Sequence, residues 1–214
     1  MKIKIAPSIL SADFSALASD IKRVERAGAD LLHIDIMDGC FVPNITIGPV
    51  VVKHIRRVTS LALDVHLMIK NPQDFIDAFI KAGSDMITVH IETVSALQFA
   101  NLAKKLRRKK VKAGVSLNPD TPLSKIKKIL KFTDFVLVMS VYPGFSGQKF
   151  IPSVLSKIKE LRRIYKKDIS VDGGVNAEVA AKIINSGANI LAAGSYIFGA
   201  KSVKKAIQSL RNAK

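Results

Sequence analysis

Three observations predict that this 214-residue chain folds as an α/β protein, a single (β/α)₈ barrel of the TIM type. First, helical patterns that stop at a glycine, two or three residues before a strand pattern begins, recur at Gly28, Gly83 and Gly187. Second, these glycines are 55 and 104 residues apart, close to two and four units of one-eighth of the chain. Third, strand-then-helix units fill the remaining sequence, which favours a closed parallel sheet over an open doubly wound one.

Taken in order, each unit begins with a strand pattern and continues with an amphipathic helical pattern. We expect strands at residues 3–8, 31–37, 62–68, 85–91, 112–117, 134–140, 168–172 and 189–194. The sixth strand is apolar without alternation, as expected where both faces of a sheet are covered. The helix after it has an apolar stripe opposite a basic face, with the stripe made of Val154, Leu155, Ile158, Leu161 and Ile164. With 48% hydrophobic residues, we expect residues 1–214 to form one domain around one large core.

The formal net charge of +17 raises the alternative of a basic barrel that binds nucleic acid. The densest run of basic residues, 104–112, falls at the end of a predicted helix, where cations interact favourably with the helix dipole. The other lysines and arginines are spread over many segments. We therefore expect a solvated face and no nucleic-acid partner, with a positive field that can raise the encounter rate of an anionic substrate.

The chain carries no sign of a membrane span or of a disulfide framework. No stretch approaches the roughly 20 apolar residues that a spanning helix needs, and the first ten residues are too short and strand-like for a signal peptide. The single cysteine, Cys40, permits no internal disulfide and fits a reducing compartment. We expect a soluble, cytoplasmic protein without membrane contact, with Cys40 in a loop. We also expect a homo-oligomer, although the sequence does not set the number of subunits.

Polar side chains lie near the ends of three of the predicted strands, at the barrel end where chemistry takes place in this architecture. His33 and Asp35 lie two positions apart and share a face, His66 ends the third strand, and Asp172 ends the seventh. Two imidazoles and two carboxylates suit a divalent transition ion, with zinc or ferrous iron favoured over magnesium because of the nitrogen ligands. A lone strand histidine such as His90 is instead expected to be a hydrogen-bonded core residue.

Glycine-bearing loops follow the sixth, seventh and eighth strands, at residues 142–148, 172–176 and 192–195. Their backbone N–H groups can approach an anion closely, and the helix beginning near Asn176 adds its positive end. Barrels often bind phosphate at this place. Met37, Met68 and Met139 each end a strand, where they either fill gaps in the core or form a dry lid over a reacting anion; both interpretations stay open.

These residues stand in stretches that together resemble the ribulose-phosphate 3-epimerase family from end to end of the chain. The stretches are APSILSADF, HIDIMDGCFVPNITIGP, VHLMI, PGFSGQKF, VDGGVN and GSYIF. The resemblance implies one divalent ion, zinc or iron before manganese or cobalt, held by His33, Asp35, His66 and Asp172. It implies that Asp35 and Asp172 are the two acid/base groups that interconvert D-ribulose 5-phosphate and D-xylulose 5-phosphate through an enediolate, in the pentose phosphate pathway. The residues expected around this phosphorylated ketose are Ser8, Met37, His66, Met68, Met139, Gly144, Phe145, Ser146, Gly147, Gly173, Gly174, Gly194 and Ser195.

The sequence departs from the family pattern at two positions of the sixth loop. The family usually has Asn where Tyr142 stands and Gly where Ser146 stands. The metal and carboxylate positions are unchanged, so the reaction type is unaffected, but loop closure and sugar preference are in question. Allulose-6-phosphate 3-epimerases carry the same signature residues, and their substrate is the alternative within the family.

Overall fold

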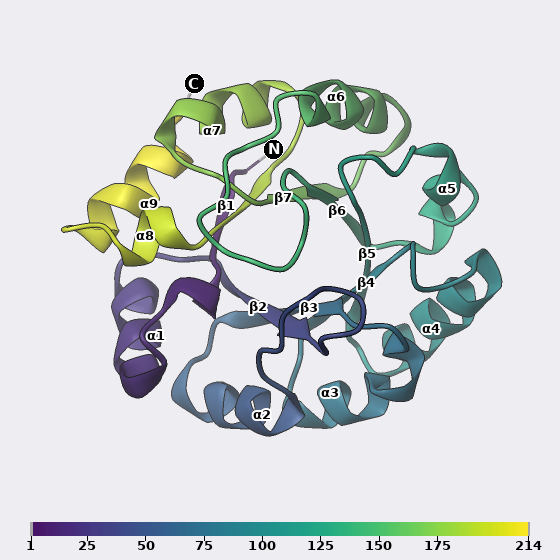
Figure 1. Ribbon diagram of the computed structural model, residues 1–214, viewed down its shortest axis with the longest axis horizontal. Coiled ribbons are helices and arrows are strands. Elements are labelled where there is room, and N and C mark those ends of the chain that lie inside the picture. The colour runs from purple at the N-terminus through teal and green to yellow at the C-terminus, as the bar shows by residue number, and fades with distance from the viewer. Residues whose placement is uncertain (1, 214) are drawn as a thin grey trace.

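The computed structural model describes residues 2–213, which form an eight-stranded parallel sheet with an outer ring of helices (Figure 1). The strand order is β1-β8-β7-β6-β5-β4-β3-β2, and a parallel bridge between Ser8 and His33 joins the ends of this order into a barrel. The strands are β1 Lys4–Pro7, β2 Leu31–Met37, β3 Ala62–Met68, β4 Met86–His90, β5 Lys112–Leu117, β6 Phe135–Met139, β7 Asp168–Asp172 and β8 Ile190–Ala193. Each begins and ends within one residue of its predicted bounds, and the (β/α)₈ prediction is confirmed.

The helices follow the strands along the chain, as predicted. They are α1 Leu17–Arg26, α2 Pro49–Val58, α3 Ile76–Ala82, α4 Ala96–Arg108, α5 Ser124–Lys127, α6 Val154–Ile164, α7 Ala177–Asn185, α8 Ser195–Phe198 and α9 Val203–Arg211. The fifth helix is only one turn, because Pro119 and Pro122 delay its start, and a 3₁₀ turn at Leu130–Phe132 completes the connection.

The predicted apolar stripe of α6 is correct except at its end. Val154, Ile158 and Leu161 are buried, whereas Ile164 is 47% exposed. Ile164 is the last residue of the helix, and the next side chain, Tyr165, enters the core in its place. The tyrosine hydroxyl donates a hydrogen bond to the backbone oxygen of Thr133, which satisfies its polar end.

Left-handed helix ends occur where the glycine repeat predicts them. Gly28, Gly83 and Gly187 have φ values of 93°, 96° and 111°. A Cβ atom at Gly83 would also lie 2.7 Å from Cγ of Arg56. Glycine is therefore the residue that lets the chain leave each helix and turn inward toward the next strand.

Alternating residues of each strand face either the helices or the barrel interior. On β2, Leu32, Ile34 and Ile36 belong to the main hydrophobic core, so the intervening His33 and Asp35 face the interior. The strand register places Asp35 beside His66, Met37 beside Met68, and Met139 beside Asp172. The polar residues of three different strands therefore reach the same level at the carboxyl end of the barrel.

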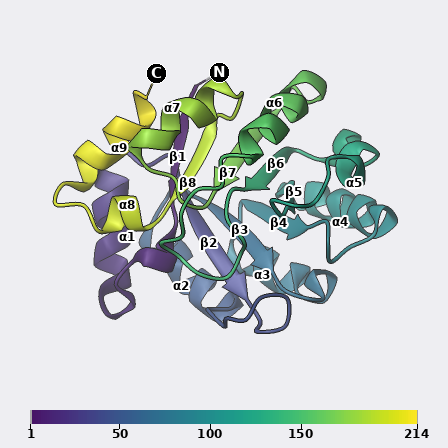
Figure 2. The same cartoon turned by 45° about the horizontal axis from the view of Figure 1, so that its top comes forward.

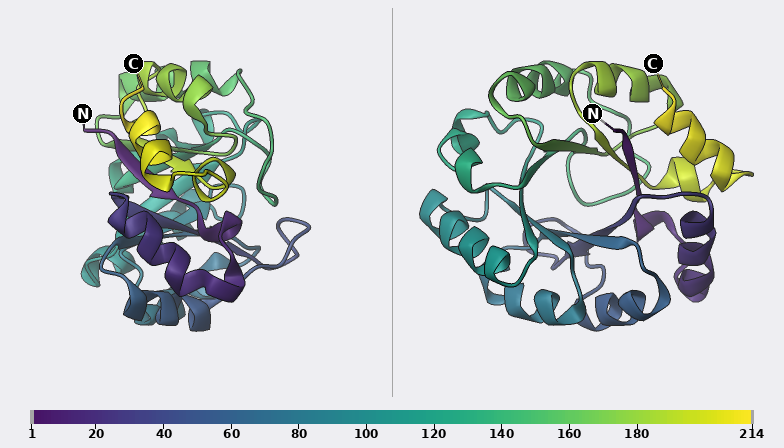
Figure 3. Two further views of the ribbon diagram at one scale, coloured as in Figure 1. Left: turned by 90° about the vertical axis from the view of Figure 1, so that its left-hand side faces the viewer. Right: turned by 180° about the vertical axis from the view of Figure 1, so that it is seen from behind.

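Loops at this end extend over the barrel mouth, and the loop after β6 crosses it (Figure 2). The loop after β2 projects beyond the barrel on the side opposite the N-terminus (Figure 3, left) and carries Cys40, which is exposed as expected. The lysines and arginines of residues 104–112 are exposed at the end of α4 and in the turn to β5, as expected. Within residues 2–213, no helix is long and apolar enough to cross a membrane.

Candidate active site

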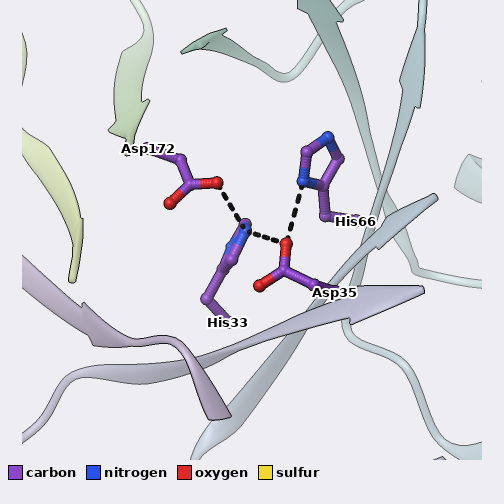
Figure 4. Close-up of side chains that lie close together, drawn as sticks. All are labelled: His33, Asp35, His66 and Asp172. Atoms are coloured by element: carbon purple, nitrogen blue, oxygen red, sulfur yellow. Dashed lines mark hydrogen bonds and ion pairs between the residues drawn. The ribbon is translucent and has the colours of Figure 1, made fainter. Parts of the chain in front are cut away.

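The structure brings together the four side chains that the sequence places at strand ends. His33 and Asp35 come from β2, His66 from β3 and Asp172 from the end of β7, and one ligand atom of each lies within 4.8 Å of those of the others (Figure 4). Oδ1 of Asp35 is 3.2 Å from both Nε2 of His33 and Nδ1 of His66, and Oδ2 of Asp172 is 3.7 Å from Nε2 of His33. Two nitrogens and two carboxylates therefore surround one point at the barrel mouth.

This cluster fits a single divalent ion. Nε2 of His33 is buried and has no aligned hydrogen-bond partner among the described residues, although oxygens of Asp35 and Asp172 lie near it. A buried polar atom without a partner is rare and requires an explanation. Metal–ligand bonds of about 2.0–2.2 Å place opposite ligands roughly 4 Å apart, which is close to the spread of these four side chains.

Two further side chains hold the cluster in place. Nδ1 of His33 is 2.9 Å from Oδ2 of the buried Asp64, and this contact leaves Nε2 of the ring turned to the cluster. The hydroxyl of Ser8 donates to Oδ2 of Asp35 at 2.6 Å. Sequence analysis identified Ser8 but missed Asp64, whose signal was its position two residues before His66 on the same face of β3.

Burial and mutual charge separate the proton affinities of the four groups. Burial disfavours a charged His33, but the charges of Asp35 and Asp64 prevail and raise its pKa well above the usual value. Burial likewise acts against a charged Asp35, yet the charge of His33 lowers the pKa of this carboxyl. Burial raises the pKa of Asp172 to about 7, and burial lowers the pKa of His66 to about 4. The carboxylates Asp35 and Asp64 thus favour a positive charge at this point of the cluster, the place that an ion would take.

A pocket of about 530 Å³, counting its open mouth, lies against this cluster. Asp35 and Asp172 line it together with nearly all residues expected around a substrate. These are Ser8, Met37, Met68, Met139, Gly144, Phe145, Ser146, Gly147, Gly173, Gly174, Gly194 and Ser195. His66 is the exception, because it is fully buried and does not line the pocket.

The three methionines combine the two interpretations that the sequence left open. Met37 and Met68 are buried against each other and Val42, and Met139 is buried with Leu137 and Val141. All three also line the pocket. Their thioethers therefore fill the top of the barrel and at the same time form an apolar wall beside the carboxylates.

The two residues after β7 must be glycines, because their φ angles are positive and because neighbouring atoms leave no room for a side chain. Gly173 and Gly174 have φ values of 111° and 63°, and a Cβ atom on Gly174 would lie 2.5 Å from the backbone nitrogen of Phe150. The start of α7 differs from expectation, because the Asn176 side chain itself accepts hydrogen bonds from the first turn. The start of α8 at Ser195 has no such side-chain cap.

The loop after β6 is tied to two neighbouring loops. The Tyr142 hydroxyl donates to Oδ2 of Asp120 at 2.5 Å, and Nδ2 of Asn44 donates to the backbone oxygen of Gly144 at 2.7 Å. Gln148 donates to two backbone oxygens inside the loop. Sequence analysis identified Tyr142 as a departure from the family but missed both partners, Asn44 and Asp120, because contacts between separate loops leave no periodic signal.

Fold and site together define a class: a (β/α)₈ protein with a buried two-histidine, two-aspartate cluster beside a glycine-lined pocket. The model of the ribulose-phosphate 3 epimerase family matches residues 4–198, and the chain belongs to this family. It is 54% identical to the ribulose-phosphate 3-epimerase of Bacillus subtilis (strain 168), with 99% of this chain and 100% of that protein covered. It is 49% identical to the chloroplastic ribulose-5-phosphate-3-epimerase of Arabidopsis thaliana, with 99% of this chain and 77% of that protein covered.

A likeness to solved structures extends beyond the family. The crystal structure of 3-hexulose-6-phosphate synthase matches with a TM-score of 0.73 at 20% sequence identity, and 100% of this chain and 99% of that chain are covered. At this level of identity the likeness shows the barrel fold alone.

Proposed function

We propose that the protein is an isomerase that interconverts D-ribulose 5-phosphate and D-xylulose 5-phosphate, a step of the pentose phosphate pathway. The observation that carries the proposal is one pocket lined by both Asp35 and Asp172 and by the glycine loops. The names of the relatives in Bacillus subtilis and Arabidopsis thaliana support the same reaction.

In this proposal His33, Asp35, His66 and Asp172 hold one divalent ion. Their mixed nitrogen and oxygen ligands favour zinc or ferrous iron, with manganese or cobalt as substitutes. When bound, such an ion supplies Lewis-acid polarisation of the carbonyl group next to C3 of the sugar. Asp64 and Ser8 orient His33 and Asp35 toward this point through the hydrogen bonds described above.

Asp35 and Asp172 are the proposed acid/base pair. Inversion at C3 removes a proton next to a carbonyl group and returns one to the opposite face of the resulting enediolate, so a group is needed on each face. Asp35 leaves β2 and Asp172 leaves β7, with β1 and β8 between these strands in the barrel. Both carboxylates line the pocket, and we assign one face of the enediolate to each.

The phosphate group is assigned to the loops after β6, β7 and β8, where Gly147, Gly174, Gly194 and Ser195 line the pocket. Binding energy from a remote phosphate positions the reacting carbon. Purified protein is therefore expected to convert D-ribulose 5-phosphate with a kcat/KM on the order of 10²-fold or more above that for unphosphorylated D-ribulose. Steady-state kinetics with both sugars checks this, with inorganic phosphate as a weak competitor. Equal kcat/KM values for the two sugars would contradict the assignment of a phosphate site to these loops.

The choice between ribulose and allulose phosphates is assigned to the loop after β6. Tyr142, which replaces the usual Asn, fastens this loop to Asp120, and Ser146 lines the pocket. The double variant Tyr142→Asn, Ser146→Gly is expected to change the ratio of kcat/KM values for D-ribulose 5-phosphate and D-allulose 6-phosphate several-fold, because loop closure sets many kcat values. Its metal content should stay that of the wild type.

The single variant Tyr142→Phe serves as the matched control, since it keeps the ring and removes only the hydrogen bond to Asp120. If the single variant Tyr142→Phe already changes the ratio of kcat/KM values, the effect is assigned to the hydrogen bond between the loops. Unchanged kinetics of the double variant with both sugars would make the two departures neutral.

A further inference from the structure

His90 on β4 is a buried group for which the proposed reaction has no use. Its side chain is fully buried, and its Nε2 lies 2.8 Å from Nε2 of His66. The two ring centroids are 4.9 Å apart and the rings are tilted by only 21°. The centroid separation exceeds the nitrogen separation by about two ring radii, so the nitrogens point at each other nearly in plane. The contact therefore has the geometry of a hydrogen bond and not that of two stacked faces.

The direction of this hydrogen bond follows from the other side of the His66 ring. Nδ1 of His66 is 3.2 Å from Oδ1 of Asp35 and faces the cluster, while Nε2 points away from Asp35 (Figure 4). A ring nitrogen that offers its lone pair to an ion carries no hydrogen, so the neutral His66 ring carries its hydrogen on Nε2. His90 must accept this hydrogen at Nε2 and consequently carries its own on Nδ1, 3.1 Å from Oε2 of Glu92.

Glu92 is anchored by the loop after β5. Its Oε1 accepts hydrogen bonds from the backbone N–H of Asn118 and from the hydroxyl of Thr121. Nζ of Lys157 in turn binds the backbone oxygens of Asn118 and Thr121 at 2.9 and 2.8 Å. Burial would raise the pKa of Glu92, but the bonds from His90, Asn118 and Thr121 lower it to about 2. Glu92 is thus a fixed acceptor at the far end of the series of hydrogen bonds that runs from His66 through His90 to Glu92.

We propose that His90 and Glu92 are positioning residues that hold His66 with Nδ1 free of hydrogen and turned to the cluster, and thereby set the metal affinity of the protein. This inference rests on the proposed metal role of His66. The other histidine of the cluster, His33, is oriented directly by a carboxylate, Asp64. His66 receives the same orientation from Glu92 through the intervening imidazole of His90. The ring of Phe41 packs against this imidazole, with the two ring centroids 4.7 Å apart.

The variant Glu92→Gln tests this series because it changes the hydrogen-bond pattern with little change of shape. If the amide oxygen stays on Asn118 and Thr121, the NH₂ group faces Nδ1–H of His90. His90 then carries its hydrogen on Nε2, and His66 must carry its own on Nδ1, toward the cluster. If the amide turns over, its NH₂ group faces the N–H of Asn118 instead. The first arrangement places a hydrogen on the nitrogen that should face the ion, and the second leaves two donors facing each other at Asn118. Glu92→Ala avoids both and lets water accept from His90.

Metal affinity is measured by competition between metal-free protein and a chromophoric chelator for Co²⁺ and Zn²⁺. The dissociation constant is expected to rise about 10–100-fold in Glu92→Gln and His90→Leu, the usual effect of losing an orienting partner of a metal ligand. His90→Gln, whose amide oxygen can accept from His66, should recover part of the loss. Glu92→Ala should fall between Glu92→Gln and the wild type. Thr88→Val is the matched control, because Thr88 is buried two residues before His90 and its hydroxyl has no partner among the described residues.

Imidazole ¹⁵N signals of metal-free and Zn²⁺-loaded protein give the second readout, since they report which ring nitrogen carries the hydrogen. The wild type is expected to show His66 with its hydrogen on Nε2 when zinc is bound. The inference is overturned if Glu92→Gln binds metal within about twofold of the wild type, or if it binds no more weakly than Glu92→Ala. Should Glu92→Gln fail to fold, the comparison of His90→Leu with His90→Gln decides in the same way. Metal affinities that follow this order in a protein without epimerase activity would overturn the proposed function and leave the positioning role standing.

Discussion

Asp35→Asn and Asp172→Asn are each expected to lower the epimerisation rate roughly 10²–10⁴-fold in protein that still holds its ion, the usual effect of removing one acid/base group. The reason is that the two carboxylates reach the pocket from β2 and β7 and each serves one face of the enediolate. An asparagine in either place keeps the shape of the side chain but can no longer take up the proton.

An isotope experiment separates this arrangement from one in which a single carboxylate serves both faces. In D₂O, each Asn variant is expected to exchange the C3 proton of one epimer, the one that faces the remaining carboxylate, without converting it to the other epimer. The complementary variant should show the opposite preference. Proton NMR of both sugar phosphates, recorded over time, follows exchange and conversion separately.

Metal content must be measured alongside, because both aspartates are also proposed ligands. A variant that retains its ion and epimerises at the wild-type rate would show that its carboxylate is only a ligand. Asp120→Asn is the control for a carboxylate near the mouth that does not line the pocket. It should keep a bond to Tyr142, whose hydroxyl can donate to the amide oxygen, and change the rate less than either substitution inside the pocket.

Removal of the metal is the second change with a large expected effect. Exhaustive chelation should lower activity about 10³-fold or more, since a Lewis acid contributes several kcal/mol and each 1.4 kcal/mol is a factor of ten in rate. Zinc, iron, manganese or cobalt should restore the chelated wild type. His66→Ala should lose bound metal and activity together and should not be restored by any of these ions.

His54→Ala is the matched control, because His54 is exposed on α2 and is not one of the proposed ligands. It should bind metal and turn over substrate as the wild type does. Metal analysis of each protein accompanies the kinetics. Full activity in rigorously metal-free protein would contradict the metal role of the four-residue cluster.

The parts of this structure that could be predicted from sequence are those with a local signal. Strand bounds followed from apolar runs and turn glycines, and the positions of His33, Asp35, His66 and Asp172 at strand ends followed from those bounds. The short fifth helix and the exposed Ile164 were missed, because periodicity describes the middle of a helix better than its ends.

The contacts that orient the site could not be predicted in the same way. The pairing of Asp64 with His33 and of His90 with His66 depends on strand register, which a single sequence does not reveal. His90 illustrates the limit, because the expectation of a hydrogen-bonded core histidine is confirmed but its partner, a proposed metal ligand, becomes visible only in three dimensions. The bond between Tyr142 and Asp120 joins two loops and has no periodic pattern at all.

One measurement tests the central proposal most directly: proton NMR of D-ribulose 5-phosphate incubated in D₂O with purified, metal-replete protein. The proposal predicts that D-xylulose 5-phosphate accumulates to an equilibrium mixture and that both sugars acquire deuterium at C3 and at no other carbon. Failure to form D-xylulose 5-phosphate in protein with its metal site filled would contradict the proposed function, and product that retains hydrogen at C3 would contradict proton transfer by Asp35 and Asp172.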